Sequence, residues 1–129
     1  MMMLENKSAV IYGAGGAIGG AVTRAFADAG ARVYLAGRSR ARLEKVASDI
    51  DDVAGLAEVD ALDERAVAAH ADAVAAHAGG IDIAMNAVAF PFVHGVPFVE
   101  IAVEDVMQPI DAFLRTNLIT AHAVARHSF

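Results

Sequence analysis

The chain has 129 residues, of which 57% are hydrophobic, with a formal net charge of −6 and no cysteine. This length predicts one domain with its own core, and the acidic balance argues against a nucleic-acid partner. The lack of cysteine excludes disulfides and thiolate catalysis and favours a cytoplasmic location. No apolar run reaches the length of a membrane span, so we expect no membrane partner.

Strand-like and helix-like patterns alternate along the chain. Short apolar runs predict strands at residues 8–12, 32–36, 53–59 and 81–86. Amphipathic spacing predicts helices at residues 16–29, 39–50, 63–78 and 103–126. Ser39 and Asp63 are typical N-caps, whereas Gly30 and Gly79 are typical of helix ends.

The last predicted helix has Leu114, Leu118, Ala121 and Ala125 on one apolar face, and Pro109 lies either in the first turn of its main segment or at a kink. Four successive strand–helix units imply a parallel sheet with right-handed crossovers and helices on both faces. We therefore predict an α/β, Rossmann-like, doubly wound parallel sheet. Such a sheet needs about two more strands, so residues 1–129 are expected to be the first four β-α units of a truncated domain.

The stretch between the first strand and the first helix is rich in glycine, with Gly13, Gly15, Gly16, Gly19 and Gly20. A strand, a glycine turn and a helix form a phosphate-binding device, because bare N–H groups and the positive end of the helix dipole face the same point. Glycine permits positive φ and close approach of a pyrophosphate. We predict a dinucleotide site here; a turn that glycine merely shapes is the alternative.

This stretch resembles the Thr-Gly-x-x-x-Gly-x-Gly pattern of the short-chain dehydrogenase/reductase family, with Tyr12 in place of Thr and Ala17 in place of the middle Gly. The stricter G-x-G-x-x-G fingerprint is not met. The resemblance covers essentially the whole chain, which corresponds to the N-terminal half of such an enzyme. It implies cofactor contacts from Gly13, Gly15, Gly16, Ala17, Ile18 and Gly19.

The end of the second strand bears on the choice of cofactor. In the family, an acidic residue at the position of Gly37 binds the adenosine 2′-hydroxyl and selects NAD. Here that acid is missing and Arg38 and Ser39 follow. A guanidinium can bind a 2′-phosphate with two hydrogen bonds, so NADP(H) is predicted over NAD. In the alternative interpretation, the arginines are only the solvated face of the second helix.

Two further segments resemble family elements that hold the cofactor. Asp60 and the N–H of Ala61 match an element that contacts adenine, although Asp60 also suits a helix cap. Residues 85–88 resemble the Asn-Asn-Ala-Gly element beside the nicotinamide ribose: Asn86 and Ala87 match it, Met85 replaces the first Asn and Val88 replaces the Gly. A buried amide at a strand end needs partners, so a satisfied core amide is the alternative for Asn86.

The acid–base residues of the family have no match. Asn117 resembles the helix asparagine that kinks the helix and holds a water in the proton relay, which implies a supporting role in catalysis. The family's Ser and Tyr-x-x-x-Lys are missing, since the sequence has only Tyr12 and Tyr34, and only Lys7 and Lys45. The five histidines lack the spacing of metal ligands, so no metal site is predicted.

The sequence therefore predicts the cofactor portion of an NADP(H)-dependent oxidoreductase that transfers hydride to or from a small carbonyl or alcohol, inactive as a fragment. The uncovered edge of the last strand predicts a homo-oligomer. Two alternatives stay open: a non-catalytic nucleotide-binding or partner-binding half-Rossmann module, and a generic α/β domain without a cofactor. Phe90, Phe92 and Phe98 either line a substrate pocket or fold over the sheet edge.

Overall fold

The computed structural model describes residues 2–128 and places four parallel strands in one sheet. The elements follow in the order β1 (Ser8–Tyr12), α1 (Ala17–Asp28), β2 (Arg32–Gly37), α2 (Arg40–Ala47), β3 (Gly55–Glu58), α3 (Glu64–Ala78), β4 (Ile83–Asn86), the short 3-10 helix η1 (Phe98–Glu100) and α4 (Val103–Ala125). The predicted alternation of strands and helices is confirmed.

Strand β1 is an interior strand of the sheet, whose strand order is β3–β2–β1–β4. Tyr12, the last residue of β1, is paired with Ala36 of β2 on one side and Asn86 of β4 on the other. The chain therefore adds β2 and β3 on one side of β1 and crosses to the other side for β4. Loops that leave such neighbouring strands diverge and form a crevice at their carboxyl ends.

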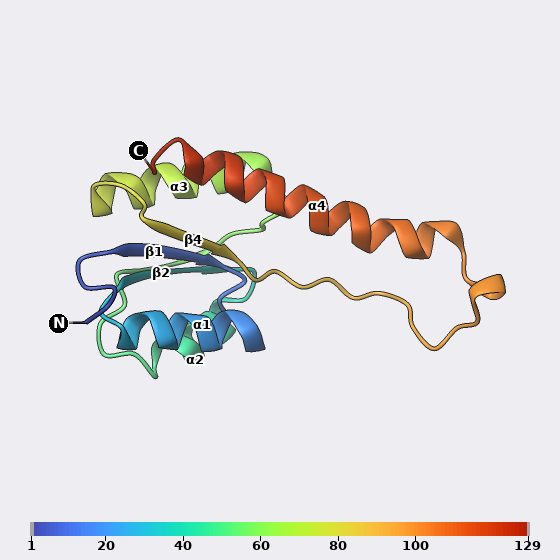
Figure 1. Ribbon diagram of the computed structural model, residues 1–129, viewed down its shortest axis with the longest axis horizontal. Helices are drawn as coiled ribbons and strands as arrows, with labels where there is room; N and C mark the ends of the chain where they lie inside the picture. Colours follow the sequence, from blue (N-terminus) through green and yellow to red (C-terminus); the bar gives the residue numbers. More distant parts are fainter. Residues whose placement is uncertain (1, 129) are drawn as a thin grey trace.

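Helices cover both faces of the sheet, with α1 and α2 on one face and α3 and α4 on the other (Figure 1). Alternate residues of β1 contribute to the two cores: Ala9 and Ile11 pack toward α1 and α2, and Val10 and Tyr12 toward α3 and α4. All four are buried. Burial on both faces explains why β1 is a continuous apolar run, and the predicted doubly wound arrangement is confirmed.

Two tyrosine–histidine pairs join the sheet to α3. The hydroxyl of Tyr12 lies 3.1 Å from Nδ1 of His70, and that of Tyr34 lies 2.7 Å from Nδ1 of His77. Burial raises the pKa of Tyr12 to about 12 and lowers the pKa of His70. The Tyr12–His70 pair is therefore neutral at pH 7, which suits its place in the core beneath α3.

Side-chain caps begin α2 and α3 as the sequence predicts. The side chains of Ser39 and Asp63 accept hydrogen bonds from N–H groups three residues later, at 3.3 and 3.1 Å. Gly79, with φ of +83°, ends α3. The predicted end of α2 at residue 50 is wrong: the helix stops at Ala47, because residues 48–50 continue as a tighter turn.

The two edge strands are shorter than predicted. Strand β3 starts two residues later and ends one residue earlier than expected: its ladder with β2 runs from the Tyr34–Gly55 pair to the Gly37–Glu58 pair, and Ala54 and Val59 each add only one hydrogen bond beyond it. Strand β4 starts at Ile83, two residues later than expected, since the N–H of Ile81 donates to the carbonyl oxygen of His127 (3.0 Å). The other predicted bounds agree to within one residue.

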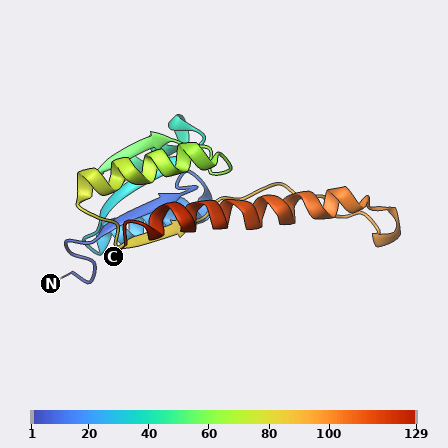
Figure 2. The ribbon, with the colours of Figure 1, turned by 90° about the horizontal axis from the view of Figure 1, so that it is seen from above.

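Helix α4 packs through a face other than the predicted apolar one. Its buried residues are Thr116, Thr120, Ala123 and Val124, whereas Leu114 and Leu118 are 58% and 62% exposed. The N-terminal half of α4 projects beyond the sheet, so its apolar side chains have no strand beneath them (Figures 1 and 2). In the C-terminal half, Thr116 and Thr120 face the sheet and bond with Asn86, which leaves Leu118 on the exposed side of the helix.

Pro109 lies inside α4, so its predicted place in the first turn is wrong; there it removes one backbone hydrogen bond from a helix that continues past it. Within residues 2–128, no helix combines the length and apolar character needed to cross a membrane.

Acidification below pH 6.5 is expected to destabilise the protein through His70. The pKa of His70 is lowered in the folded state from its ordinary value of 6.5. As pH falls through 6.5 the unfolded chain therefore binds a proton that the folded state does not, and the free energy of unfolding decreases. Urea denaturation followed by circular dichroism at several pH values measures this loss.

His70→Gln should flatten that dependence between pH 7 and pH 5, because it removes the group that titrates. His122→Gln is the matched control, since His122 is exposed on α4; this variant should keep the dependence. If the free energy of unfolding of His70→Gln changed with pH as steeply as that of the unaltered chain, His70 would not be the group responsible.

Candidate functional site

The turn between β1 and α1 is fixed by backbone contacts. The N–H groups of Gly13 and Ala14 both donate to the carbonyl oxygen of Ala36 in β2, at 2.9 and 3.1 Å. Gly13 has φ of +82°, and a Cβ there would lie 2.7 Å from the backbone of Ala87, after β4. Glycine is therefore required at this position both for the backbone conformation and for the close approach.

Gly19 brings α1 onto this turn. A Cβ on Gly19 would lie 2.0 Å from the carbonyl oxygen of Gly13, which leaves no room for any side chain. A Cβ on Gly16, the residue before α1, would meet the same oxygen at 3.5 Å, an ordinary contact. The first N–H groups of α1 have no partner inside the helix, and together with the helix dipole they favour an anion at the turn.

A cavity of about 460 Å³ lies at the carboxyl ends of the strands, beside the glycine turn. It occupies the crevice where the strand order reverses between β1 and β4. Most of the residues predicted to contact a dinucleotide line this cavity together: Gly13, Gly15, Gly16, Arg38, Ser39, Ala61, Ala87 and Val88. The fold therefore brings together four separate segments that the sequence singled out.

Other predicted contact residues lie outside the wall of this cavity. Ala17 and Ile18 form the first turn of α1, where Ile18 is 69% exposed, and Gly19 is buried behind the turn. The carboxylate of Asp60 is exposed and accepts a hydrogen bond from the N–H of Leu62 (3.0 Å). Asp60 therefore shapes the start of the loop before α3, and Asp63 rather than Asp60 caps that helix.

Two arginines give the cavity its charge. Arg38 and Arg42 line it, and every other lining residue is uncharged. Within the part of the chain that the structure describes, neither arginine has an ion-pair partner, whereas Arg40 pairs with Glu44 at 3.7 Å. The arginines that follow β2 therefore differ in position. Arg40 is part of the solvated face of α2, whereas Arg38 and Arg42 line the cavity.

Sequence reasoning missed part of the wall. The residues not singled out as contacts are Gly37, Arg42, Leu43, Val59 and Ala89. Arg42 had a usable signal, because it lies in the first turn of the helix that follows Arg38 and Ser39. The apolar lining residues had no such signal in the sequence, because they line the cavity only through the positions at which the strands end.

Asn86 connects the cavity wall to α4. Its Nδ2 donates to the carbonyl and hydroxyl oxygens of Thr116, at 3.3 and 3.2 Å, and to the hydroxyl of Thr120 at 3.2 Å. Its Oδ1 accepts from the N–H of Val88 at 3.0 Å. The hydroxyl of Thr116 in turn donates to the carbonyl oxygen of Ala61 at 2.9 Å. One side chain thus positions two opposite parts of the wall. No sequence pattern had indicated a role for the two threonines.

Asn117 lies apart from the glycine turn. Its amide donates to the carbonyl oxygen of Phe113, four residues back, at 2.8 Å, and α4 continues through it. Asn117 and Asn86 both line a smaller cleft of about 340 Å³ along the free edge of β4. No group of three metal-binding side chains gathers anywhere in residues 2–128.

Gly19→Ala should destabilise the protein by about 3 kcal/mol or more, because the added methyl would overlap the carbonyl of Gly13. Gly16→Ala is the matched control and should change the free energy of unfolding by less than about 1 kcal/mol. Urea denaturation of both variants measures the difference. Equal stability of the two would contradict the packing described for the turn.

Asn86→Ala should lower the free energy of unfolding by about 2–4 kcal/mol, since it removes the donor to the two threonine hydroxyls and leaves the N–H of Val88 without its acceptor. Asn117→Ala removes only the hydrogen bond to the carbonyl oxygen of Phe113 in the same helix, so it should lower the free energy of unfolding by less than about 1 kcal/mol. Thermal and urea unfolding separate the two variants, and a larger loss in Asn117→Ala would refute this account.

Residues 7–128 match the family described as short chain dehydrogenase. An uncharacterized oxidoreductase of Bacillus subtilis is 40% identical over 89 residues, which cover 67% of this chain and 33% of that protein. An uncharacterized oxidoreductase of Mycobacterium tuberculosis is 33% identical over 132 aligned positions, which cover 95% and 45% of the two chains. The chain therefore spans half or less of the length of these relatives.

Solved structures give the same result. A short-chain type dehydrogenase/reductase from Mycobacterium marinum is 31% identical, with a TM-score of 0.80 over 96% of this chain and 51% of that one. A short chain dehydrogenase from Burkholderia cenocepacia, solved in complex with NADP, is 28% identical, with a TM-score of 0.81 over the same shares. The glycine turn, the parallel sheet and these matches together establish that the chain belongs to the short-chain dehydrogenase family.

Proposed function

We propose that residues 1–129 belong to the dinucleotide-binding domain of an NADP(H)-dependent oxidoreductase. The observation that carries the proposal is the cavity of about 460 Å³ beside the glycine turn, with two arginines that have no ion-pair partner among residues 2–128. The family to which the chain belongs binds nicotinamide cofactors. The choice of NADP(H) and the assignment of contact residues are our own.

The wall of the cavity fits the parts of a dinucleotide. The glycine turn and the N-terminus of α1 would hold the pyrophosphate, because they offer N–H groups and positive potential where no side chain intrudes. Asp60 and Ala61 would lie at the adenine end, and Asn86, Ala87 and Val88 at the nicotinamide end. When bound, the nicotinamide supplies or accepts a hydride.

Arg38 and Arg42 support NADP(H) rather than NAD. A 2′-phosphate carries negative charge that two guanidinium groups can hold with charge-assisted hydrogen bonds. The cavity wall contains no carboxylate. No lining residue would therefore repel the 2′-phosphate of NADP(H), and no carboxylate is there to bind the 2′-hydroxyl of NAD. Ser39 adds a hydroxyl at the same end, although its Oγ also caps α2.

The reaction of the complete enzyme would be hydride transfer between the nicotinamide and a small carbonyl compound or alcohol. Asn117 would support it from α4, as a positioning residue. Because this sequence contains no Tyr-x-x-x-Lys, we propose that the 129-residue chain binds the cofactor without turnover. This makes a non-catalytic nucleotide-binding module the second candidate, and NADPH-dependent reduction of any carbonyl compound by the purified chain would exclude it.

We further propose that the protein acts in the cytoplasm as a homo-oligomer. In the described part of the chain, β4 pairs only with β1 and leaves its other edge open. An open parallel edge favours association. Light scattering tests the association, and a monodisperse monomer would contradict it.

Titration with NADPH and NADH, followed by nicotinamide fluorescence, tests the choice of cofactor. The unaltered chain should bind NADPH at least about tenfold more tightly than NADH. Arg38→Ala should weaken NADPH binding by about tenfold or more and leave NADH binding nearly unchanged. Arg40→Ala is the matched control, because Arg40 pairs with Glu44 outside the cavity. Equal affinity for both cofactors would contradict the proposal.

A further inference from the structure

Three hydrogen bonds run in one direction from the loop after β4 to the loop after β3. The N–H of Val88 donates to Oδ1 of Asn86 at 3.0 Å, and Nδ2 of Asn86 donates to the hydroxyl oxygen of Thr116 at 3.2 Å. That hydroxyl in turn donates to the carbonyl oxygen of Ala61 at 2.9 Å. We call these three bonds the Val88–Ala61 network. Because its donors all point the same way, each bond polarises and strengthens the next one.

Both ends of the Val88–Ala61 network belong to the wall of the dinucleotide cavity. Ala61 and Val88 line that cavity, whereas Thr116 is fully buried behind the wall. Ala61 is assigned to the adenine end of the cofactor and Val88 to the nicotinamide end. A ligand that touches one end can therefore act on the other end through residues that it does not touch.

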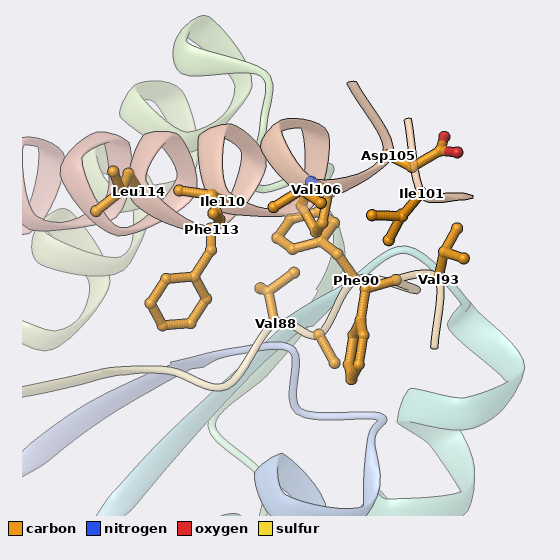
Figure 3. A pocket seen from close by; sticks show the side chains of 12 residues that line it. Val88, Phe90, Val93, Ile101, Asp105, Val106, Ile110, Phe113 and Leu114 are labelled. Carbon is orange, nitrogen blue, oxygen red and sulfur yellow. The ribbon is translucent and has the colours of Figure 1, made fainter. Parts of the chain in front are cut away.

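Val88 also lines a second cavity, of about 640 Å³, between α4 and the segment after β4. In Figure 3, Val88 and Phe90 of that segment stand opposite Ile110 of α4. Of the three phenylalanines expected either in a pocket or over the sheet edge, Phe90 and Phe92 line this cavity and Phe98 does not. The position of Val88 therefore shapes both cavities.

Thr116 is the member of the network that joins segments far apart in the sequence. Its hydroxyl donates outside its own helix, to Ala61. Thr120, one turn later, also accepts from Asn86, at 3.2 Å. Among residues 2–128, however, the hydroxyl of Thr120 donates only to carbonyl oxygens of α4, those of Thr116 and Asn117. The β-branched side chain of Thr116 has few rotamers, and its burial leaves no water to replace either of its bonds.

We propose that Thr116 is a positioning residue that couples the two ends of the dinucleotide cavity. A phosphorylated adenosine held at the Ala61 end would fix that carbonyl oxygen, strengthen the Val88–Ala61 network and order the wall at Val88 for the second half of the cofactor. Coupling of this kind is reciprocal, so a ligand at Val88 strengthens binding at Ala61 by the same factor. The network rests on the hydrogen bonds themselves, whereas the choice of ligand rests on the proposed function.

The first experiment needs no ligand. Hydrogen exchange of the 129-residue chain, followed by 15N NMR, measures how often the N–H of Val88 opens. Thr116→Val keeps the shape of the side chain and removes its hydroxyl, so it should speed this exchange by about threefold or more. Thr120→Val is the matched control, because it also removes a hydroxyl bonded to Asn86, and it should leave the exchange within about twofold. Thr116→Ser should restore slow exchange, since it brings the hydroxyl back.

The second experiment adds adenosine 2′,5′-bisphosphate to the unaltered chain. Saturation should slow exchange of the Val88 N–H by about threefold or more. Ala87 is the internal control, because it also lines the cavity but donates to the carbonyl oxygen of Tyr12 (2.8 Å), outside the network. Its exchange should change by less than about twofold. In Thr116→Val the bisphosphate should still shift the signal of Gly13 but should no longer slow exchange at Val88.

Any of three results would overturn the inference: equal effects of Thr116→Val and Thr120→Val, fast exchange that persists in Thr116→Ser, or slowing by the bisphosphate that is absent at Val88 or equal at Ala87. Slowing at Val88 that persists in Thr116→Val would also overturn it, because the ligand would then act by direct contact. If Thr116→Val does not fold, the comparison of Val88 with Ala87 in the unaltered chain decides. A bisphosphate that does not bind would contradict the proposed function, and the ligand-free variants would then decide the role of Thr116.

Discussion

The backbone of Gly13 is enclosed from two sides. On one side, α1 approaches so closely that a Cβ on Gly19 would lie 2.0 Å from the carbonyl oxygen of Gly13. On the other side, a Cβ on Gly13 itself would lie 2.7 Å from the backbone of Ala87. These contacts fix the start of α1 relative to the loop after β4. The position of the cavity, the direction of the helix dipole and the placement of the arginines all follow from them.

Asn86 extends this arrangement to the other face of the sheet. Through Thr116 it links the end of β4 to the carbonyl oxygen of Ala61, and through Val88 it holds the wall shared by the two cavities. Both polar atoms of its amide have protein partners, so Asn86 positions the backbone at the end of β4. The same network explains why α4 buries threonines and leaves its leucines in solvent.

Local patterns in the sequence were enough to predict the fold, the caps at Ser39 and Asp63 and many of the residues that line the cavity beside the glycine turn. Local patterns did not predict the features that depend on contacts between segments far apart in the sequence. The length of β3 depends on its pairing with β2, and the buried face of α4 depends on the bonds that Thr116 makes with Asn86 and Ala61. Arg38 could be singled out from its place after a strand, but only the fold separates Arg42, which faces the cavity, from Arg40.

The central claim is that the glycine turn holds a dinucleotide pyrophosphate. NMR of the chain labelled with 15N at glycine measures this directly, since each glycine amide reports on its own surroundings. Addition of NADPH should shift the signals of Gly13, Gly15 and Gly16 and leave those of Gly55 and Gly79, which lie outside the cavity, in place. Saturating NADPH that moves none of the three turn glycines, or moves Gly55 and Gly79 equally, would contradict the account.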